Sequence, residues 1–381
     1  MSANESEVHA QVREIARRFT AEKLTPFAAA WDEQGGYPRE LVAEMGSLGF
    51  MGITVPEEWG GAGLDNLAGA IVLEEISAGS GSMGIIVSGH NAVGCMPILQ
   101  FGTQAQKDTY LRPFARGEQL TAFALTEPAG GSDVAQLRTR AERRNDRYIL
   151  NGTKQFITSG STADVALIFA TTDPDAPRGK GISGFIVPTD APGYTVDRIE
   201  NKMGLKASDT CVISLDSVEV PFENRLGEEG QGYKIALSNL EGGRIGIGAQ
   251  AIGIARAALE AALDYARERH TFGVPISDHQ AVAFRLADMA TELEAARQLV
   301  FYAARLKDGG QPSLQQASMA KLKATEMAES VCSDAIQIFG GYGYMEDYPV
   351  ARLARDARGT KIYEGANDIQ RLVVSRSLLT G

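Results

Sequence analysis

One acidic side chain near the end of the chain stands where it could act as a base. Glu364 lies in the run Tyr363–Asp368, just ahead of an Asn-Asp pair. Asn and Asp favour helix starts because their side-chain oxygens accept free N–H groups of the first turn, so we expect Glu364 to precede a helix. A carboxylate in apolar surroundings has a raised pKa and can accept a proton near neutral pH. Spacing alone favours a helix-capping glutamate, the more common role.

Four further stretches combine aromatic, hydroxyl and glycine residues in patterns that suit ligand binding. In 122–133 a short apolar run leads into a Pro-Ala-Gly-Gly-Ser turn, whose backbone donors could cradle a ring system and a phosphate. The others are 156–160, 269–273 with 279–280, and 337–344. Taken singly, each also fits an ordinary strand end or loop.

The elements that must position these stretches change in character twice along the chain. Residues 1–118 carry apolar residues at helical spacing, 119–228 hold short apolar runs punctuated by Pro and Gly, and 229–381 return to long helical patterns. We therefore predict an α+β protein with an N-terminal helical domain (1–118), a middle β-barrel or sandwich domain (119–228) and a C-terminal four-helix bundle (229–381). The βαβ alternation and the G-x-G-x-x-G pattern of a Rossmann fold are missing.

The helical regions can be divided further. In the first domain we predict helices at 8–30, broken near 20–26, at 40–48, at 66–77 and at 93–101, with 80–88 as a small, flexible segment before the last of them. In the last domain we predict helices at 231–269, 280–306, 314–339, 350–357 and 369–379. The first of these is rich in small residues, so we expect it to be buried among its neighbours.

The middle domain is expected to contain a hairpin. Residues 147–158 read as two strands around an Asn-Gly turn, because this dipeptide favours two-residue hairpin turns. Further strands are predicted at 120–125, 165–171, 182–187 and 212–215.

Composition excludes several classes of function. The net charge is −11, which disfavours binding to nucleic acid. We expect no apolar run to be long enough to cross a membrane, and Met1–Glu7 lacks the features of a signal peptide. Three distant cysteines and four scattered histidines show neither disulfide nor metal-ligand spacing. We expect a cytoplasmic protein without a metal and without a membrane partner.

Taken together and in this order, the five stretches resemble the acyl-CoA dehydrogenase family over nearly the whole chain. The family's fold has an N-terminal helical domain, a middle β domain and a C-terminal four-helix bundle, which agrees with the order predicted above. The resemblance implies bound FAD and oxidation of an acyl-CoA thioester to a trans-2-enoyl-CoA. Glu364 then takes the α-proton while the β-hydride passes to flavin N5.

The resemblance also implies which residues hold FAD. Phe123, Leu125 and Thr126 would lie along the isoalloxazine, Gly131 and Ser132 in the turn near the pyrophosphate and substrate, and Phe156 over the ring with Thr158 near N5. The FAD of a neighbouring subunit would be reached by Arg269, Thr271, Phe272, Gln280, Gln337, Gly340 and Gly341, and the adenine half touched by Ala366 and Asp368. Family members often have Trp where Phe156 stands and Thr where Ala366 stands.

On the substrate side, the resemblance implies contacts from Ser132, Glu241, Arg244 and Gly365. A subset of relatives carries its base at the position of Gly243, which cannot serve, and this strengthens the assignment to Glu364. The stretch 202–210 also resembles a family segment, but it fits an ordinary polar loop and we assign it no role.

Several wider properties follow from the resemblance. The acyl chain is expected to be short or branched and short, and no Arg or Lys occurs between Glu75 and Phe101 to bind a glutaryl-type carboxylate. Shared cofactor sites imply at least a dimer, and a homotetramer is typical. Electron-transferring flavoprotein is the expected acceptor. The alternatives are an acyl-CoA oxidase, a flavin monooxygenase or nitroalkane oxidase on the same fold, and a non-catalytic FAD- and acyl-CoA-binding assembly factor.

Overall fold

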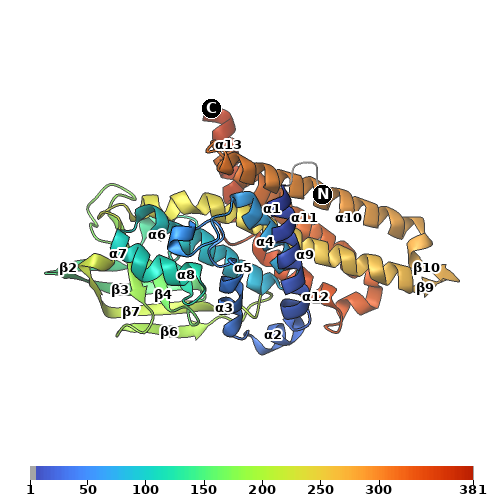
Figure 1. The fold of residues 1–381 in the computed structure, drawn as a ribbon, viewed down its shortest axis with the longest axis horizontal. Helices are drawn as coiled ribbons and strands as arrows, with labels where there is room; N and C mark the ends of the chain where they lie inside the picture. The colour runs from blue at the N-terminus through green and yellow to red at the C-terminus, as the bar shows by residue number, and fades with distance from the viewer. Residues whose placement is uncertain (1–5, 381) are drawn as a thin grey trace.

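The computed structural model describes residues 6–380 and has the predicted order of helices, β domain and helical bundle (Figure 1). The β domain forms one end of the elongated molecule, and the bundle extends to the other end. The N-terminal helices pack across the middle, so the three parts meet around the central helices.

The N-terminal part is helical throughout. Its α-helices are α1 (Glu7–Phe19), α2 (Ala28–Gln34), α3 (Glu40–Ser47), α4 (Asn66–Gly79), α5 (Gly81–Gly89), α6 (Met96–Phe101), α7 (Gln104–Gln106) and α8 (Arg112–Ala115). π-helical turns at Thr20–Leu24, His90–Cys95 and Lys107–Leu111 join some of them. The segment expected to be flexible is instead the buried helix α5, capped by Ser80, whose hydroxyl accepts the Met83 N–H. The small residues of α5 allow close packing against neighbouring helices. A run of small residues fits either close packing or flexibility, and composition alone does not distinguish the two.

The middle part is one mixed sheet. Its strands are β1 (Thr121–Ala124), β2 (Arg140–Arg144), β3 (Arg147–Thr158), β4 (Val165–Thr171), β5 (Ile182–Pro188), β6 (Tyr194–Ile199), β7 (Thr210–Pro221) and β8 (Arg225–Leu226). The order across the sheet is β6-β7-β3-β2-β4-β5-β8, and β1 pairs with β4 in parallel. The ends of β1 and β3 carry the stretches singled out in the sequence.

The predicted hairpin at Asn151-Gly152 is wrong, because β3 runs through both residues as one strand. The turn lies at Asn145, which has a φ of +54° and connects β2 to β3. At Gly152 the pairing with β7 shifts register, and Asn151 Oδ1 accepts the Ser217 N–H at 2.8 Å. The Asn-Gly pair therefore forms a bulge, in which the amide oxygen replaces a missing ladder partner.

The C-terminal part is built on one long helix. Its helices are α9 (Gly232–Glu268), α10 (Gln280–Asp308), α11 (Leu314–Phe339), α12 (Pro349–Thr360) and α13 (Asn367–Thr380), with a hairpin of β9 (His270–Thr271) and β10 (Val274–Pro275) between α9 and α10. The predicted burial of α9 is confirmed. A Cβ on Gly253 would lie 2.2 Å from the Glu74 carbonyl oxygen on α4, so α9 and α4 can approach this closely only without a side chain there.

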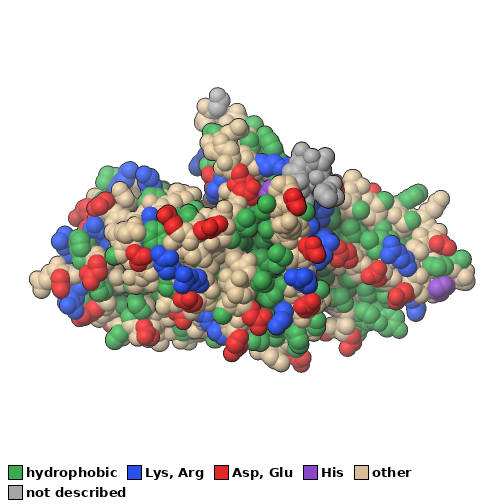
Figure 2. Space-filling model, viewed as in Figure 1, with side chains coloured by type: hydrophobic (Ala, Val, Ile, Leu, Met, Phe, Trp, Pro, Cys, Tyr) green, Lys and Arg blue, Asp and Glu red, His purple; other side chains and the backbone are tan. Residues whose placement is uncertain are grey.

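Two helical segments, Gly81–Phe101 and Gly232–Glu268, are long and apolar enough to cross a membrane, so the expectation that no run reaches that length is wrong. In the protein, 72% and 78% of their most apolar windows are buried inside the fold. Buried fractions of this size are typical of helices in the core of a folded protein. Figure 2 shows acidic and basic side chains interspersed over one face of the molecule.

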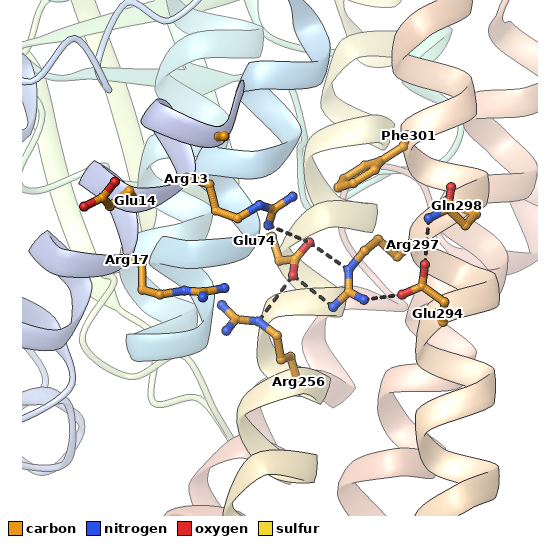
Figure 3. A pocket seen from close by; sticks show the side chains of 10 residues that line it. Arg13, Glu14, Arg17, Glu74, Arg256, Glu294, Arg297, Gln298 and Phe301 are labelled. Carbon is orange, nitrogen blue, oxygen red and sulfur yellow. Dashed lines mark hydrogen bonds and ion pairs between the residues drawn. The ribbon is translucent and has the colours of Figure 1, made fainter. Parts of the chain in front are cut away.

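A cavity of about 440 Å³ lies where α1 and α4 meet α9 and α10, and charged side chains line it (Figure 3). Glu74 and Glu75 on α4 are each 1% exposed. Their partners are Arg256 and Arg297 for Glu74, at 3.2 and 3.0 Å, and Arg13, Arg17 and Arg256 for Glu75, at 3.1, 3.0 and 2.6 Å. Because these ion pairs link side chains of α1 and α4 to α9 and α10, the cluster joins the N-terminal helices to the bundle.

Replacing Glu75 with alanine is expected to lower the free energy of unfolding by about 3–5 kcal/mol, because buried guanidinium groups lose their carboxylate. The measurement is urea denaturation followed by circular dichroism at one fixed protein concentration. Glu14→Ala is the control, since Glu14 is exposed and lines the same cavity. An equal loss of unfolding free energy in the two variants would show that the buried ion pairs of Glu75 contribute no more to stability than an exposed glutamate does.

Candidate functional site

Glu364 lies in the short connection between α12 and α13, in a backbone conformation that few residues adopt. Its φ is +54°, and that of Gly365 is +87°. α13 begins at Asn367, as the Asn-Asp pair predicts. Glu364 makes no capping hydrogen bond, and its Oε2 atom is buried without a hydrogen-bond partner among residues 6–380. Strained backbone and an unpaired carboxylate oxygen together are typical of functional sites.

The carboxylate of Glu364 rests against α9. A Cβ on Gly243 would lie 2.6 Å from its Oε2 atom, so a larger residue at 243 would displace the carboxylate. The neighbouring Arg244 is 7% exposed and donates a hydrogen bond to Ser318 Oγ at 3.3 Å. The structure thus places the two candidate base positions, 243 and 364, directly against each other.

The surroundings of Glu364 favour proton uptake near neutral pH. Burial raises the pKa of Glu364 to about 7, while the charges of Arg244 and Lys321 act in the opposite direction. Burial acts on the carboxylate because the ionised form loses its hydration. A carboxylate with such a pKa is suited to general base catalysis.

Tyr363 and the loop 202–209 fix the same connection from the other side. The Tyr363 hydroxyl donates to Gln250 Oε1 at 3.0 Å. Leu205 donates its N–H to Asp356 Oδ1 on α12 at 2.5 Å, and a Cβ on Gly359 would lie 3.1 Å from the Tyr363 ring and 3.2 Å from Leu205. The loop to which we assigned no role therefore ties the β domain to the helix that leads into the base.

A buried lysine that the sequence analysis did not single out lies under this connection. Lys321 on α11 is 0% exposed, and its Nζ donates to the Gly365 carbonyl oxygen at 2.9 Å. Lysines in helices are usually exposed, so the sequence offers little signal for it beyond its alanine- and leucine-rich surroundings.

A second group of predicted residues gathers at the ends of β1 and β3. Thr126 accepts the Gln155 N–H through its carbonyl oxygen at 2.9 Å, and a Cβ on Gly131 would lie 3.4 Å from Thr126 Cγ2. Phe156 has a φ of +58° and is 62% exposed. The other members lie as follows: Phe123 packs on Phe169, Leu125 is buried, Thr158 is partly exposed, and Ser132 is exposed on the turn.

This turn rests on a buried ion pair that the sequence analysis also missed. Lys154, 0% exposed, donates to Glu127 Oε1 at 2.8 Å, to the Leu125 carbonyl at 3.3 Å and to the Phe169 carbonyl at 2.6 Å. Glu127 in turn accepts the N–H groups of Arg138 and Thr139 at 2.6 and 3.0 Å. Alternation along β3 is the only sequence signal that Lys154 points inward.

The third group lies at the far end of the bundle, opposite the β domain (Figure 1). The Arg269 guanidinium lies over the Tyr342 ring at 5.8 Å, and Phe272, at the tip of the β9–β10 hairpin, is 98% exposed. Thr271 contacts His279, and the remaining members, Gln280, Gln337, Gly340 and Gly341, are exposed. One chain therefore cannot bring this group to its own β domain.

The remaining candidates surround the base. Glu241 is partly buried and hydrogen-bonded to Ser313. Ala366 is partly exposed, and the Asp368 side chain is 94% exposed. A cavity of about 60 Å³ follows the same stretch of α9; it is lined by Asn239, Gly242, Ile245 and Gly246, by Leu73 and Ser88 from the N-terminal helices, and by Lys307. Among residues 6–380, no group of three or more His, Cys, Asp or Glu side chains could hold a metal.

The residues at the β-domain turn fit a flavin. Thr126, which is partly buried, and the exposed Gly131 lie close together on the turn, and the exposed Phe156 ring, on a residue with a left-handed backbone, offers an apolar face. An exposed aromatic in this conformation is costly in water. A planar ring system with a polar edge would cover both features.

The chain matches three consecutive family models. They are described as the N-terminal, middle and C-terminal domains of acyl-CoA dehydrogenase, and they match residues 6–118, 122–218 and 230–379. A curated acyl-CoA dehydrogenase of Bacillus subtilis is 50% identical over 97% of this chain and 97% of its own length. The human mitochondrial short-chain specific acyl-CoA dehydrogenase is 46% identical over 98% of this chain and 90% of its own length.

Solved structures show the same fold. Butyryl-CoA dehydrogenase from Megasphaera elsdenii matches with a TM-score of 0.96 and 43% identity over 100% of both chains. A chain from the structural study of the electron transferring flavoprotein of Acidaminococcus fermentans matches with a TM-score of 0.98 and 46% identity, also over 100% of both chains.

Gly243→Ala is expected to reduce the rate of the chemical step by about 100-fold, because a displacement of a reacting group by roughly 1 Å costs this much. The added methyl would meet the Glu364 carboxylate at 2.6 Å. Single-turnover kinetics with the purified yellow protein measure the effect. The matched control is Gly89→Ala, where a Cβ meets nothing within 4 Å; a rate for Gly243→Ala equal to that of this control would contradict the placement.

Lys154→Met is expected to weaken retention of FAD by about 10-fold or more, since it leaves the Glu127 carboxylate buried and unpaired. Flavin fluorescence during dilution measures the loss. The exposed Lys180→Met in the same domain is the charge control. Adding Glu127→Gln to Lys154→Met should restore part of the affinity, and no difference from the control would show that the pair does not support the turn.

Proposed function

Because this chain belongs to the acyl-CoA dehydrogenase family, we propose that it dehydrogenates an acyl-CoA thioester between its α and β carbons, with Glu364 as the base. The observation that carries the assignment is the Glu364 carboxylate, whose Oε2 is buried, unpaired and in contact with the glycine at 243. The product is a trans-2-enoyl-CoA.

The chemistry needs a base beside a weakly acidic carbon. The α-hydrogen of a thioester is removed only if the developing enolate is stabilised. Within residues 6–380, the Glu364 N–H donates to no backbone or side-chain acceptor. This N–H is therefore free to bind the thioester carbonyl while the carboxylate of the same residue takes the α-proton.

We propose that FAD is held by the turn that contains Thr126, Gly131 and Ser132 and covered by Phe156. When bound there, FAD would supply the acceptor for the β-hydride at N5. Thr126 and Thr158 offer hydroxyls to its polar edge, while Phe123 and Leu125 support the apolar side. The remaining assignments to the cofactor, Ala366 and Asp368 included, stay proposals of the same kind.

We propose a short acyl chain as substrate. The cavity along α9 is about 60 Å³, and Leu73 and Ser88 limit it: a Cβ on Gly246 would lie 2.5 Å from Ser88 Oγ and 3.3 Å from Leu73. The names of two relatives, a short-chain specific and a butyryl-CoA dehydrogenase, agree with this size. Glu241, Arg244 and Gly365 would line the path of the thioester.

We propose a homotetramer in which each cofactor is shared. The β9–β10 hairpin, which follows Arg269 and contains Thr271 and Phe272, lies at the opposite end of the molecule from the β domain (Figure 1), and Phe272 is 98% exposed. A second copy would place this end against its partner's flavin. The predicted apolar residues of α13 are exposed in the single chain, with Leu372 at 41% and Leu379 at 85%, so they offer a further surface for assembly.

We propose electron-transferring flavoprotein as the acceptor, which the match to a chain from a study of such a flavoprotein supports. An acyl-CoA oxidase would use the same base and pass electrons to oxygen, and an assembly factor would bind thioesters without reduction. A cytoplasmic location stays a prediction.

The domain boundaries at 118/119 and 228/229 also stay proposals. The first falls between α8, which ends at Ala115, and β1, which begins at Thr121. The second falls between β8, which ends at Leu226, and α9, which begins at Gly232.

Glu364→Gln is expected to keep yellow FAD and to lose dehydrogenation by about 10³-fold or more, because the α-proton has no acceptor. An anaerobic titration with butyryl-CoA, followed by bleaching of the flavin absorbance, measures this. In the unchanged protein the rate should rise with pH through about 7, since Glu364 must be ionised to act and burial raises its pKa to about 7.

Longer thioesters in the same titration rank the substrates, and steady peroxide formation in air would favour the oxidase. Near-normal turnover by Glu364→Gln would remove Glu364 as the base. Tight thioester binding with no bleaching by the unchanged protein would favour the assembly factor.

A further inference from the structure

The connection that carries Glu364 is held by a lysine on a different helix. Lys321 Nζ donates to the Gly365 carbonyl oxygen at 2.9 Å and to Asn367 Oδ1 at 3.1 Å. These acceptors lie one and three residues after Glu364. Lys321 is 0% exposed. Fully buried lysines are rare and occur only where the ammonium group has hydrogen-bonding or charged partners.

The connection needs such support because its backbone is unfavourable. Glu364 and Gly365 both have positive φ, which is unfavourable for a non-glycine residue such as Glu364. The Gln370 side chain donates to the carbonyl oxygens of Glu364 and Gly365 at 3.3 and 2.7 Å. Gln370 reaches these carbonyls from one side and Lys321 reaches Gly365 from α11, so the turn is held between two helices.

Asn367 extends the same network. Its Nδ2 donates to Thr325 Oγ1 at 3.1 Å, one turn along α11 from Lys321. Its own N–H donates to the Lys361 carbonyl oxygen at 3.0 Å. The first residue of α13 is thereby fixed to α11, and the position of the base follows from this attachment.

The titratable and charged groups around Glu364 come from several elements. They are Arg244 and Glu241 on α9, Lys321 on α11, Asp356 on α12, and Tyr363 on the connection itself. Burial lowers the pKa of Lys321 to about 7 while the Glu364 charge raises it, and Lys321 in turn lowers the pKa of Glu364. The ammonium and the carboxylate therefore stabilise each other's ionised forms.

We propose that Lys321 is a positioning residue for the dehydrogenation: it clamps the turn that presents Glu364 and keeps the carboxylate ionised in its buried setting. The inference rests on the proposed function of Glu364. Lys321 touches neither substrate nor cofactor in this role, and it acts through the Gly365 carbonyl and Asn367.

The test compares three variants as FAD-loaded proteins. Lys321→Met removes both charge and donor, Lys321→Gln keeps a donor without the charge, and Lys323→Met removes an exposed lysine two residues along α11 that pairs with Glu292. The probe is butyryl-CoA, and the measurement is the anaerobic rate of flavin bleaching between about pH 6 and pH 9.

For Lys321→Met we expect the acid limb of this profile to move up by about 1 pH unit, since loss of a neighbouring positive charge raises a carboxyl pKa. At pH values below the limb the rate should fall by about 10-fold, because raising the pKa of Glu364 by 1 unit lowers its ionised fraction about 10-fold there. Above it, the rate should recover in part. Lys321→Gln should show the shift with a higher plateau, and Lys323→Met should match the unchanged protein.

A second readout does not depend on turnover. The infrared carboxyl band that disappears in Glu364→Gln reports the protonation of Glu364, and its titration should move in the same direction in both Lys321 variants. Unchanged limbs and an unchanged carboxyl titration in Lys321→Gln would overturn the inference, including in the case where Lys321→Met does not fold. If the unchanged protein fails to bleach with any thioester, the proposed function fails instead.

Discussion

The structure depends on keeping one carboxylate ionisable inside the protein. Burying a charge is unfavourable unless other charges or hydrogen bonds compensate it, and Oε2 of Glu364 has no hydrogen-bond partner among residues 6–380. Arg244 and Lys321 compensate from two helices without pairing directly to it. The result is a carboxyl group whose pKa is raised to about 7 and whose Oε2 atom is not engaged by another described residue.

The rest of the fold holds this arrangement in place. α9 is the common support, because its glycines let Glu364 approach at Gly243 and let α4 approach at Gly253. Buried ion pairs from Glu74 and Glu75 to Arg256 then join the N-terminal helices to α9. A separate buried pair within the β domain, Lys154 with Glu127, holds the turn at the end of β1.

The distribution of exposed aromatic residues supports the proposed assembly. Phe156 stands on the β domain and Phe272 at the opposite end of the bundle, and both are exposed at positive φ. Each would be costly as a free surface, and neither can cover the other within one chain. In the proposed assembly, in which cofactors are shared between subunits, both rings would be covered.

The sequence by itself determined the order of the elements, because hydrophobic periodicity is a local property; the bounds of β4 and α11 follow from it directly. It also determined that Glu364 precedes a helix, through the Asn-Asp pair. It misread the Asn-Gly pair at 151–152 as a turn and the segment 80–88 as flexible, since pairing with β7 and packing against α9 are made by distant residues. Only the tertiary structure decided that Lys321 and Lys154 are buried and that Gly243 faces the base, because a side chain's environment depends on elements far away in the sequence.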